Sequence, residues 1–424
     1  MTDVTRKIHR RIDDLKGDLV DLTVELIRIP TTNPPGENYT ECAEFVGNWL
    51  KKRGFEVEYI RGLDTPGDSD KFPRTNIVAR LEGKRPGECV HFNSHIDVVE
   101  AGEGWTFDPF GGEIKDGKIY GRGSCDMKGG LATSMIAVEA FLVEVPDFAG
   151  AIEISGTVDE ETGGYGGVAY LAEKGYFSKP RVDHVIIPEP LNKDRICLGH
   201  RGGWWGEIET HGRIAHGSMP FLGDSAILHM GAVMEEFNDK LYPLLADKKT
   251  EMPVVPDGAK QSTININSIH GGEAEGFDGL PAACVADSCR LIFDRRFLIE
   301  ESMDEVKGEI VSILDGLQRN RDGFTYSIRN INEIYPTMTK KDAAVPRALA
   351  SGIEAVLNTT PDYVISPGSY DQKHIARLGH MHNCVAYGPG ILDLAHQPDE
   401  YIGIDDMVDS AKIMASALCE LLSK

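Results

Sequence analysis

Histidine and carboxylate side chains recur in this sequence directly after apolar runs or inside glycine- and proline-rich turns. They are His95, Asp97, Asp126, Asp159, Glu160, Glu161, Glu189 and His396. In an α/β sheet the ends of the strands meet at one edge, where ligands bind. Several like charges gathered there are unfavourable unless cations compensate them. Carboxylate oxygens mixed with imidazole nitrogens suit zinc, cobalt or manganese, so the sequence predicts a metal centre.

Each of these signals has an ordinary explanation when it is taken alone. A single histidine after a strand, such as His95, is more often a hydrogen-bonded structural residue. A pair of adjacent glutamates usually belongs to a solvated surface. The glycine-rich segment 121–130 matches neither of two common nucleotide-binding patterns, GxGxxG and GxxxxGK(S/T). The metal prediction therefore depends on all the segments together and on their order.

Strands that alternate with helices are predicted to position these residues. The apolar or β-rich runs that we expect to form strands are 55–60, 76–81, 89–93, 151–157, 183–188 and 383–387. The segments with helical spacing are 15–29, 40–53, 131–144, 168–174, 343–357 and 404–422. This alternation predicts an α/β sandwich with a largely parallel or mixed sheet.

The pattern changes near Gly199 and changes back after Tyr335. Between these points the expected strands are 206–210, 263–269, 285–293 and 325–331, and the expected helices are 225–245 and 303–317. Two helices over one face of a four-stranded antiparallel sheet would bury every apolar face. We therefore predict a catalytic domain, 1–198 with 335–424, that is interrupted by an inserted α+β domain, 199–334.

The composition limits the classes of protein to which the chain can belong. Lysine plus arginine total 44 and aspartate plus glutamate total 67, so the formal net charge is -23. Such a chain is repelled by phosphate backbones and anionic lipid, so we expect neither a nucleic acid nor a membrane surface as its partner. Eight cysteines without a CxxC pair, no long apolar segment and no signal peptide favour a soluble cytoplasmic protein.

Taken in order, the segments resemble the di-metal aminohydrolase family of acetylornithine deacetylase, succinyl-diaminopimelate desuccinylase, aminoacylases and glutamate carboxypeptidases. The motifs that carry the resemblance are 94–97 (SHID), 121–130 (GRGSCDMKGG) and 159–164 (DEETGG). The resemblance covers essentially the whole chain and implies that the inserted domain is a lid or dimerisation domain. It also implies a di-zinc or zinc/cobalt enzyme that hydrolyses the linear amide of a small N-acyl amino acid or related compound. A dipeptidase or carboxypeptidase on the same scaffold is the alternative, and a catalytically silent binding protein is the rival from another class.

The resemblance implies five metal ligands. Asp126 would bridge two ions, which is natural for a carboxylate with two oxygens. His95 and Glu189 would complete one site. Glu161 and His396 would complete the other.

The resemblance also implies the groups that move the proton. Glu160 would be the general base that deprotonates a metal-bridged water and later protonates the leaving nitrogen. Asp97 would hold His95 in the tautomer that binds metal. Adjacent residues on an extended strand point to opposite sides, so we expect Glu160 and Glu161 to serve different purposes.

Two residues of the inserted domain match the family pattern. His216 lies in the segment 212–220, which resembles a Gly-x-x-Ala-His-x-x-x-Pro turn. The resemblance implies that this histidine reaches the active site of the partner subunit in a homodimer and helps to hold the carbonyl oxygen; a surface histidine is the alternative. Arg296 resembles the arginine that binds a substrate carboxylate, and the alternative is a sheet arginine that pairs with an acid.

Two segments depart from the family pattern. The first is Asp278-Gly279-Leu280-Pro281, where an asparagine is usual at the position of Asp278. The second is 367–374, which places Tyr370 and Lys373 where the family has other pocket residues. We expect Tyr370 to contact the substrate, and the departures leave the acyl group and the amine open.

Overall fold

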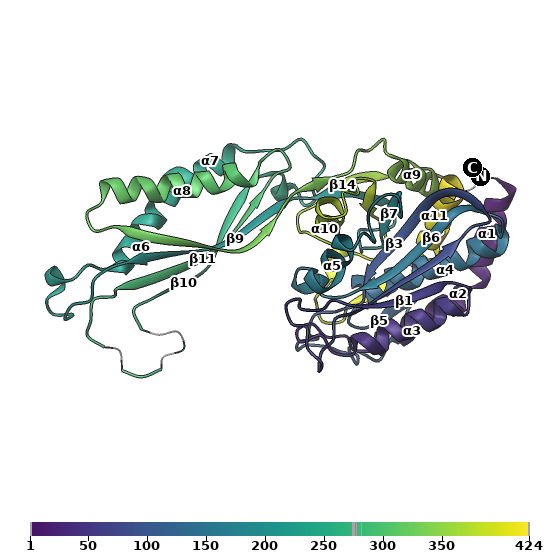
Figure 1. The fold of residues 1–424 in the computed structure, drawn as a ribbon, viewed down its shortest axis with the longest axis horizontal. Helices are drawn as coiled ribbons and strands as arrows, with labels where there is room; N and C mark the ends of the chain where they lie inside the picture. Colours follow the sequence, from purple (N-terminus) through teal and green to yellow (C-terminus); the bar gives the residue numbers. More distant parts are fainter. Residues whose placement is uncertain (1, 274–275, 277, 281, 423–424) are drawn as a thin grey trace. The chain divides into compact units, whose positions relative to one another are not determined.

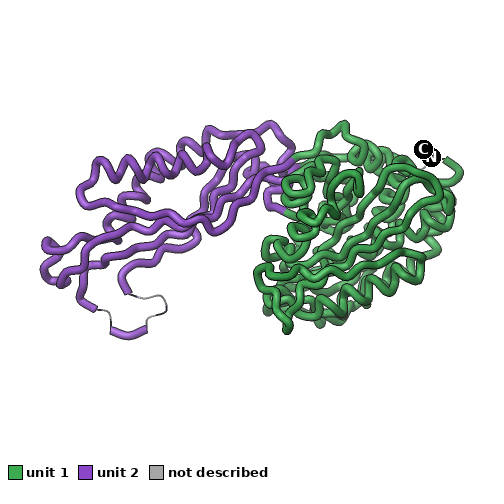
Figure 2. The backbone as a smooth tube through the Cα atoms, in the orientation of Figure 1, with its two compact units in different colours: residues 1–199, 338–364, 370–424 green, residues 200–337, 365–369 purple. Residues whose placement is uncertain are grey.

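The computed structural model describes residues 2–273, 276, 278–280 and 282–422 of this chain. Pro281, the last residue of the segment 278–281 that departs from the family pattern, therefore lies outside the described residues. The chain forms two compact units (Figure 2). Unit 1 comprises 1–199, 338–364 and 370–424, and unit 2 comprises 200–337 and 365–369. The short segment 365–369, which the sequence analysis placed in the catalytic domain, is thus part of unit 2.

A mixed sheet organises unit 1 (Figure 1). Its strands, in spatial order, are β1 (Glu56–Arg61), β2 (Thr75–Glu82), β6 (Ala149–Thr157), β3 (Arg85–His95), β7 (His184–Ile187), β15 (Cys384–Ala386), β8 (Arg195–His200) and β13 (Thr337–Met338), with β14 (Asp362–Ser366) paired to β8. Strands β6, β3, β7 and β15 are parallel, whereas β1, β2 and β8 run antiparallel to their neighbours. The parallel strands therefore end at one edge, as predicted.

Helices cover this sheet. They are α1 (Asp3–Asp14), α2 (Lys16–Ile27), α3 (Tyr39–Lys51), α4 (Gly129–Glu144), α5 (Tyr170–Glu173), α9 (Ala344–Leu357), α10 (Gln372–Arg377) and α11 (Ile404–Leu422). The terminal helices α1 and α11 pack against each other and against α4 (Figure 1). Because α4 is apolar on nearly every side, it is buried almost completely. The helix expected at 15–29 is present as α2, but the expectation that it opens the chain is wrong, because α1 precedes it.

A small antiparallel sheet lies beside the site. Its strands, in spatial order, are β16 (Tyr401–Gly403), β5 (Lys118–Tyr120) and β4 (Glu113–Lys115). Strand β5 leads into the glycine-rich turn that follows it, and β16 follows the segment that carries His396. Pairing of β5 with β16 therefore brings together two segments that lie far apart in the sequence.

Unit 2 is the four-stranded antiparallel sheet with helices that the sequence predicts, and the predicted fold class is confirmed. In spatial order its strands are β10 (Thr263–Gly271), β11 (Ser288–Phe297), β9 (Gly202–His211) and β12 (Thr325–Ile334). Its helices are α6 (Ala226–Glu236), α7 (Tyr242–Asp247) and α8 (Met303–Asn320). Alternate residues of β11, such as Leu291 and Phe293, share one core with Val233 of α6 and Ile310 of α8. Helix α8 begins at a capping box formed by Ser302 and Glu305.

Candidate metal centre

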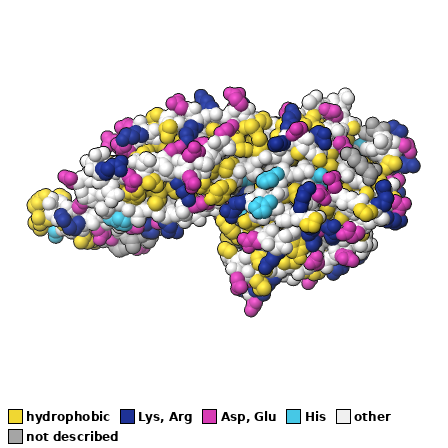
Figure 3. Space-filling model, turned by 45° about the horizontal axis from the view of Figure 1, so that its top comes forward, with side chains coloured by type: hydrophobic (Ala, Val, Ile, Leu, Met, Phe, Trp, Pro, Cys, Tyr) yellow, Lys and Arg dark blue, Asp and Glu magenta, His cyan; other side chains and the backbone are white. Residues whose placement is uncertain are grey.

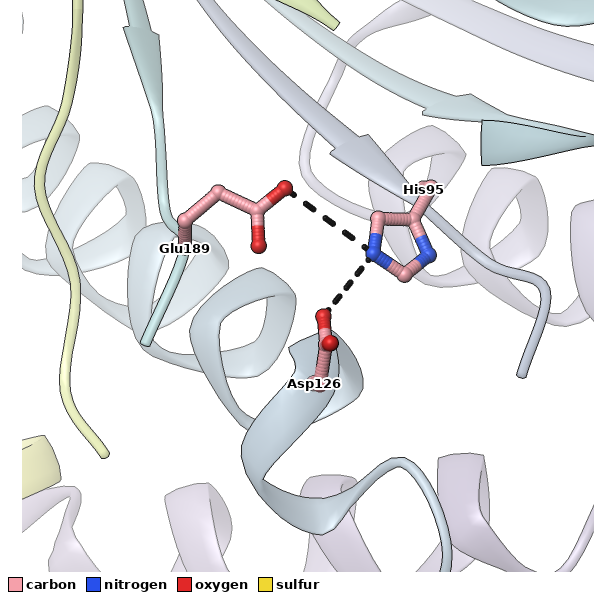
Figure 4. A group of neighbouring side chains, drawn as sticks. All are labelled: His95, Asp126 and Glu189. Carbon is pink, nitrogen blue, oxygen red and sulfur yellow. Dashed lines mark hydrogen bonds and ion pairs between the residues drawn. The ribbon is translucent and has the colours of Figure 1, made fainter. Parts of the chain in front are cut away.

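Five side chains of unit 1 form two groups that could each hold a metal ion, and both groups include Asp126. One group joins Asp126 to His95 and Glu189 (Figure 4), and the other joins it to Glu161 and His396. Within each group the ligand atoms lie within 4.8 Å of one another. The structure thus brings together all five residues that the sequence predicts as ligands.

In the first group, the Nε2 atom of His95 faces two carboxylates (Figure 4). It lies 3.1 Å from Oδ1 of Asp126 and 3.9 Å from Oε1 of Glu189. The other ring nitrogen, Nδ1, lies 2.9 Å from the main-chain carbonyl oxygen of Asp97 and 3.6 Å from its carboxylate. The main-chain carbonyl is therefore the nearer acceptor for the ring N–H, which leaves Nε2 for a metal ion.

In the second group, the Nε2 atom of His396 lies 3.0 Å from Oε2 of Glu161 and 3.4 Å from Oδ2 of Asp126. His396 has a φ of 64°, in the left-handed region that few residues other than glycine adopt. Oδ1 of Asp126 faces His95 and Oδ2 faces His396, so the two oxygens of this carboxylate face different histidines. This is the arrangement that a carboxylate shared by two ions requires.

Asp126 is held in place by Glu400, a residue that the sequence analysis did not assign. The main-chain N–H groups of Cys125 and Asp126 donate to Oε1 of Glu400 at 2.8 and 3.0 Å. Its other oxygen, Oε2, accepts from Nη1 of Arg122 at 2.5 Å, and both side chains are buried. The sequence offers only one signal for this contact, the position of Glu400 shortly after His396.

Glycine allows the turn before α4 to approach the end of β7. A Cβ atom on Gly130 would collide with the carbonyl oxygen of Pro188, the residue that precedes Glu189. A Cβ atom on Gly129 would collide with the carbonyl oxygen of Ser124. The Gly-Gly pair therefore lets the segment that carries Asp126 lie beside the ligand Glu189.

The electrostatics of the centre fit two cations. Burial raises the pKa of Glu189 well above its usual range, and the nearby charge of Asp126 adds to this effect. Burial also raises the pKa of Glu161 to about 7. Hydrogen bonds to Asp126 and Glu161 raise the pKa of His396 to about 10. Buried carboxylates that resist ionisation need positive charge beside them, and the imidazole and carboxylate donors suit a divalent ion such as zinc.

Glu160 belongs to neither ligand group. Its Oε1 atom lies 3.0 Å from Nζ of Lys373, and both side chains are largely buried. The main-chain N–H groups of Glu160 and Glu161 point at the carboxylate of Asp97, each at 3.2 Å. The expected extended strand is wrong here, because Asp159 has a φ of 64° and the segment 160–162 forms a 3₁₀ turn. This turn, rather than strand alternation, separates the two glutamates.

Tyr370, which we predict to contact the substrate, is a buried side chain. This side chain is buried in the main core of unit 1, and its hydroxyl donates to Oε1 of Gln372 at 2.5 Å. Burial raises the pKa of this hydroxyl well above its usual range. The role of Tyr370 in substrate binding stays a prediction, whereas Lys373, three residues later, reaches Glu160.

The predicted residues of unit 2 lie on its surface or in its sheet. His216 is exposed, and its Nδ1 atom accepts from the N–H of Ser218 at 3.1 Å. Arg296 on β11 pairs with Asp294, whose Oδ1 lies 2.8 Å from Nε. Asp278 is exposed. The roles of His216 and Arg296 in substrate binding stay predictions. Among the residues described, no helix has both the length and the apolar character that a membrane span needs.

Known proteins resemble this chain in sequence and in fold. A family profile described as Peptidase family M20/M25/M40 matches residues 91–420. Succinyl-diaminopimelate desuccinylase of Hydrogenovibrio crunogenus is 28% identical over 413 residues, which cover 96% of this chain and 99% of that protein. Human carnosine dipeptidase 1 has the same fold, with a TM-score of 0.75, 19% identity and 99% of both chains covered.

A second solved structure concerns the metal. The YXEP protein of Bacillus subtilis, described as a dinuclear metal binding peptidase from the M20 family, has a TM-score of 0.69 and 14% identity. The match covers 96% of this chain and 99% of that one. This chain has two candidate ligand groups with a shared member, as a dinuclear centre needs. The predicted enzyme class, a hydrolase of linear amides, is confirmed. The chain therefore belongs to peptidase family M20/M25/M40, the family that its motifs predict.

Proposed function

We propose that this protein is a di-metal deacylase that hydrolyses the amide bond of a small N-acyl amino acid or related N-acyl compound. The observation that carries the proposal is the orientation of Asp126, whose two oxygens face two different pairs of ligands. With Asp126, His95 and Glu189 would hold one ion, and Glu161 and His396 would hold the other. Zinc is the ion that this donor set fits best, and cobalt or manganese could replace it.

The remaining residues at the centre bind and move protons. When bound, the ions supply Lewis acidity, which lowers the pKa of a water and polarises a carbonyl group. Glu160 takes a proton from the attacking water and returns it to the nitrogen that leaves. Lys373, 3.0 Å away, holds the carboxylate of Glu160 in place. The carboxylate of Asp97 accepts from the main-chain N–H of Glu160 and so positions that residue. The main-chain carbonyl of Asp97 positions His95.

The similar desuccinylase, which matches over nearly the whole chain, supports an acyl group as one half of the substrate. The solved dipeptidase supports the alternative, a dipeptidase or carboxypeptidase, on the same fold. A substrate panel separates them: N-acetyl, N-succinyl and N-formyl amino acids and dipeptides are each supplied with zinc, cobalt or manganese. Release of amine from the acyl compounds in preference to dipeptides supports the deacylase.

The role of Glu160 has its own test. Glu160→Gln keeps the shape of the side chain and every ligand, so turnover should fall by roughly 10²–10⁴-fold while the metal content stays the same. Glu113→Gln, at an exposed position on β4, is the matched control and should leave turnover unchanged. A fully active Glu160→Gln variant would exclude this residue as the base.

We also propose that the enzyme is a cytoplasmic homodimer in which His216 acts in the partner's site. A cytoplasmic site accords with eight cysteines that form no disulfide. Hydrophobic side chains gather on the surface at one end of the molecule in Figure 3. Unit 2 also exposes Ile214, Phe221 and Leu222, with exposed fractions of 60%, 78% and 56%. Such a patch on the domain that carries His216 supports a subunit interface.

Subunit mixing tests the dimer. A heterodimer of His216→Ala and Glu160→Gln subunits would have one site with both defects and one with neither. Refolded mixtures should therefore recover up to about half of the normal activity per heterodimer. A mixture no more active than the separate variants, or a monomer in light scattering, would refute the role of His216 in the partner's site.

A further inference from the structure

A row of polar side chains crosses the core of the large sheet in unit 1. The residues are His91, Asn93, Glu153, Ser155 and Asp371, and each has an exposed fraction of 0% or 1%. His91 and Asn93 of β3 lie opposite Glu153 and Ser155 of the parallel strand β6. Sheet cores are usually apolar, and buried polar groups are unfavourable unless they are paired. We therefore followed the hydrogen bonds of this row.

The row begins at the charged edge of the core. Oε1 of Glu153 lies 2.8 Å from Nη1 of Arg80 and 2.7 Å from Nε of Arg181. Its other oxygen, Oε2, lies 3.0 Å from Nδ1 of His91. The opposite ring nitrogen of His91, Nε2, lies 2.7 Å from Oγ of Ser155. One imidazole thus joins an ion-paired carboxylate to the interior of the sheet.

The hydrogen bonds of the row all run in one direction. The hydroxyl of Ser155 donates to Oδ1 of Asn93 at 2.8 Å, and the amide of Asn93 donates to Oδ2 of Asp371 at 2.9 Å. Because Ser155 has a single hydroxyl hydrogen, it must accept from Nε2 of His91. The amide of Asn93 is therefore the donor that the row presents to the carboxylate of Asp371. The hydroxyl of Thr157 lies nearer to the carbonyl oxygen of Ser94, at 3.2 Å, than to Asp371, at 3.4 Å.

Asp371 stands at the start of α10, two residues before Lys373. The main-chain oxygen of Asp371 accepts from the N–H of His374, which closes the first turn. Gln372 donates to the carbonyl oxygen of Cys384 at 2.8 Å and so fixes the same turn to β15. Lys373 then reaches Oε1 of Glu160 at 3.0 Å. The placement of its ammonium group depends on how firmly Asp371 is held.

We propose that His91, Ser155 and Asn93 are positioning residues for the general base, because they hold Asp371 and thereby keep Lys373 against Glu160. The inference rests on the proposed function, in which Glu160 is the base. The proposed positioning role differs from a purely structural role for these residues. A structural role affects folding alone, whereas a positioning role slows turnover in a folded enzyme that still binds its substrate and metals.

Two substitutions test the row. Asn93→Asp is nearly isosteric but replaces the donor facing Asp371 with an acceptor, and Ser155→Ala removes the link to His91. We expect kcat to fall about 10- to 100-fold for Asn93→Asp and about ten-fold for Ser155→Ala, as for other residues that orient a catalytic group. KM should change less than two-fold, and metal content and thermal midpoint should match those of the control Ser134→Ala. Ser134 is equally buried and donates to the carbonyl oxygen of Leu131, away from the row.

Ser155→Thr, which restores a hydroxyl, should recover most of the turnover that Ser155→Ala loses. If Asn93→Asp does not fold, the two substitutions at Ser155 decide the question. Unchanged kcat in Ser155→Ala, or equal losses in Ser155→Ala and Ser155→Thr, would overturn the proposal.

A double-mutant cycle tests whether the row acts through Lys373. If it does, Ser155→Ala should cause little further loss of kcat in the Lys373→Met variant. Losses that multiply in the double variant would overturn the proposal, because independent sites contribute separately. Glu160→Gln is measured in parallel. If Glu160→Gln keeps full activity, the assignment of the base is wrong. If Glu160→Gln is inactive and the losses of Ser155→Ala and Lys373→Met multiply, only the positioning role is refuted.

Discussion

Replacing Glu400 by glutamine tests how the shared ligand is held. Glu400 accepts from the main-chain N–H groups of Cys125 and Asp126 and from the guanidinium of Arg122. The side chains of Arg122 and Glu400 have exposed fractions of 2% and 0%. The glutamine keeps nearly the same shape, but it removes the negative charge and turns an N–H₂ group toward a guanidinium or toward the main-chain donors.

The cost follows from the burial of the pair. Removing one partner of a buried ion pair costs about 3–5 kcal/mol, because the other charge is left uncompensated. Arg122 keeps the carbonyl oxygens of Ala101 at 3.1 Å and Gln397 at 3.4 Å, so we expect the lower end of that range. With roughly 2–4 °C per kcal/mol for a domain of this size, the thermal midpoint should fall by about 6–12 °C. Since Asp126 serves both ligand groups, both ions should bind about 10- to 100-fold more weakly.

The assay combines thermal unfolding with titration of the metal-free protein with zinc, cobalt or manganese. Asp405→Asn is the matched control, because Asp405 forms an ion pair with Lys16 at 2.6 Å but has an exposed fraction of 87%. An exposed pair of this kind contributes about 0–1 kcal/mol. If Glu400→Gln matches this control in both measurements, the buried pair does not position Asp126. Weakening of only one metal site would refute the shared role of Asp126.

Three further predictions concern packing, acid stability and the substrate pocket. Gly130→Ala should lower the metal content and activity at least ten-fold, because a Cβ collides with the backbone at the end of β7, whereas Gly231→Ala, with open space around it, should not. Burial opposes ionisation of Glu301, but the charge of Arg295 and hydrogen bonds from Leu298 and Lys248 hold its pKa below the usual 4.5. An acid whose pKa is lowered by folding stabilises the folded state at pH values above its unfolded pKa, and this stabilisation is lost as the pH falls. Below about pH 4.5 the thermal midpoint of Glu301→Gln should therefore decrease less than that of the unchanged protein. Arg296→Lys should raise KM for a substrate with a carboxylate but not for the analogue that lacks one, and equal effects on both would make Arg296 structural.

The order of the elements could be predicted because it is written in local patterns. The strand β6 and the terminal helix α11 lie within two residues of their predicted bounds, and β3 includes the predicted run 89–93 but begins four residues earlier and ends two residues later. The ligands could be predicted for a related reason. Parallel strands end at one edge, so residues such as His95 and Glu189 that follow those strands must meet. Local pattern and sheet topology together therefore determine most of the candidate centre.

The supporting contacts could not be predicted in this way, because they join residues that lie far apart in the sequence. Glu400 reaches Asp126 across 274 positions, and Asn93 reaches Asp371 across 278. No periodicity or short motif marks such pairs. The burial of Tyr370 could not be predicted for the same reason, since the direction of its side chain depends on the hydrophobic cluster around it rather than on its neighbours in the sequence.

Asp97 shows how one motif residue can contact both sides of the centre. The family resemblance implies that Asp97 holds His95, and its main-chain carbonyl lies closer to the ring than its carboxylate does. The carboxylate is directed to the other side of the centre, where the N–H groups of Glu160 and Glu161 and the amide of Asn33 point at it. Asp97 therefore connects the end of β3 to the turn that carries both glutamates. A substitution there should disturb the second ligand group and the base before it disturbs His95, which is the reverse of what the motif alone would suggest.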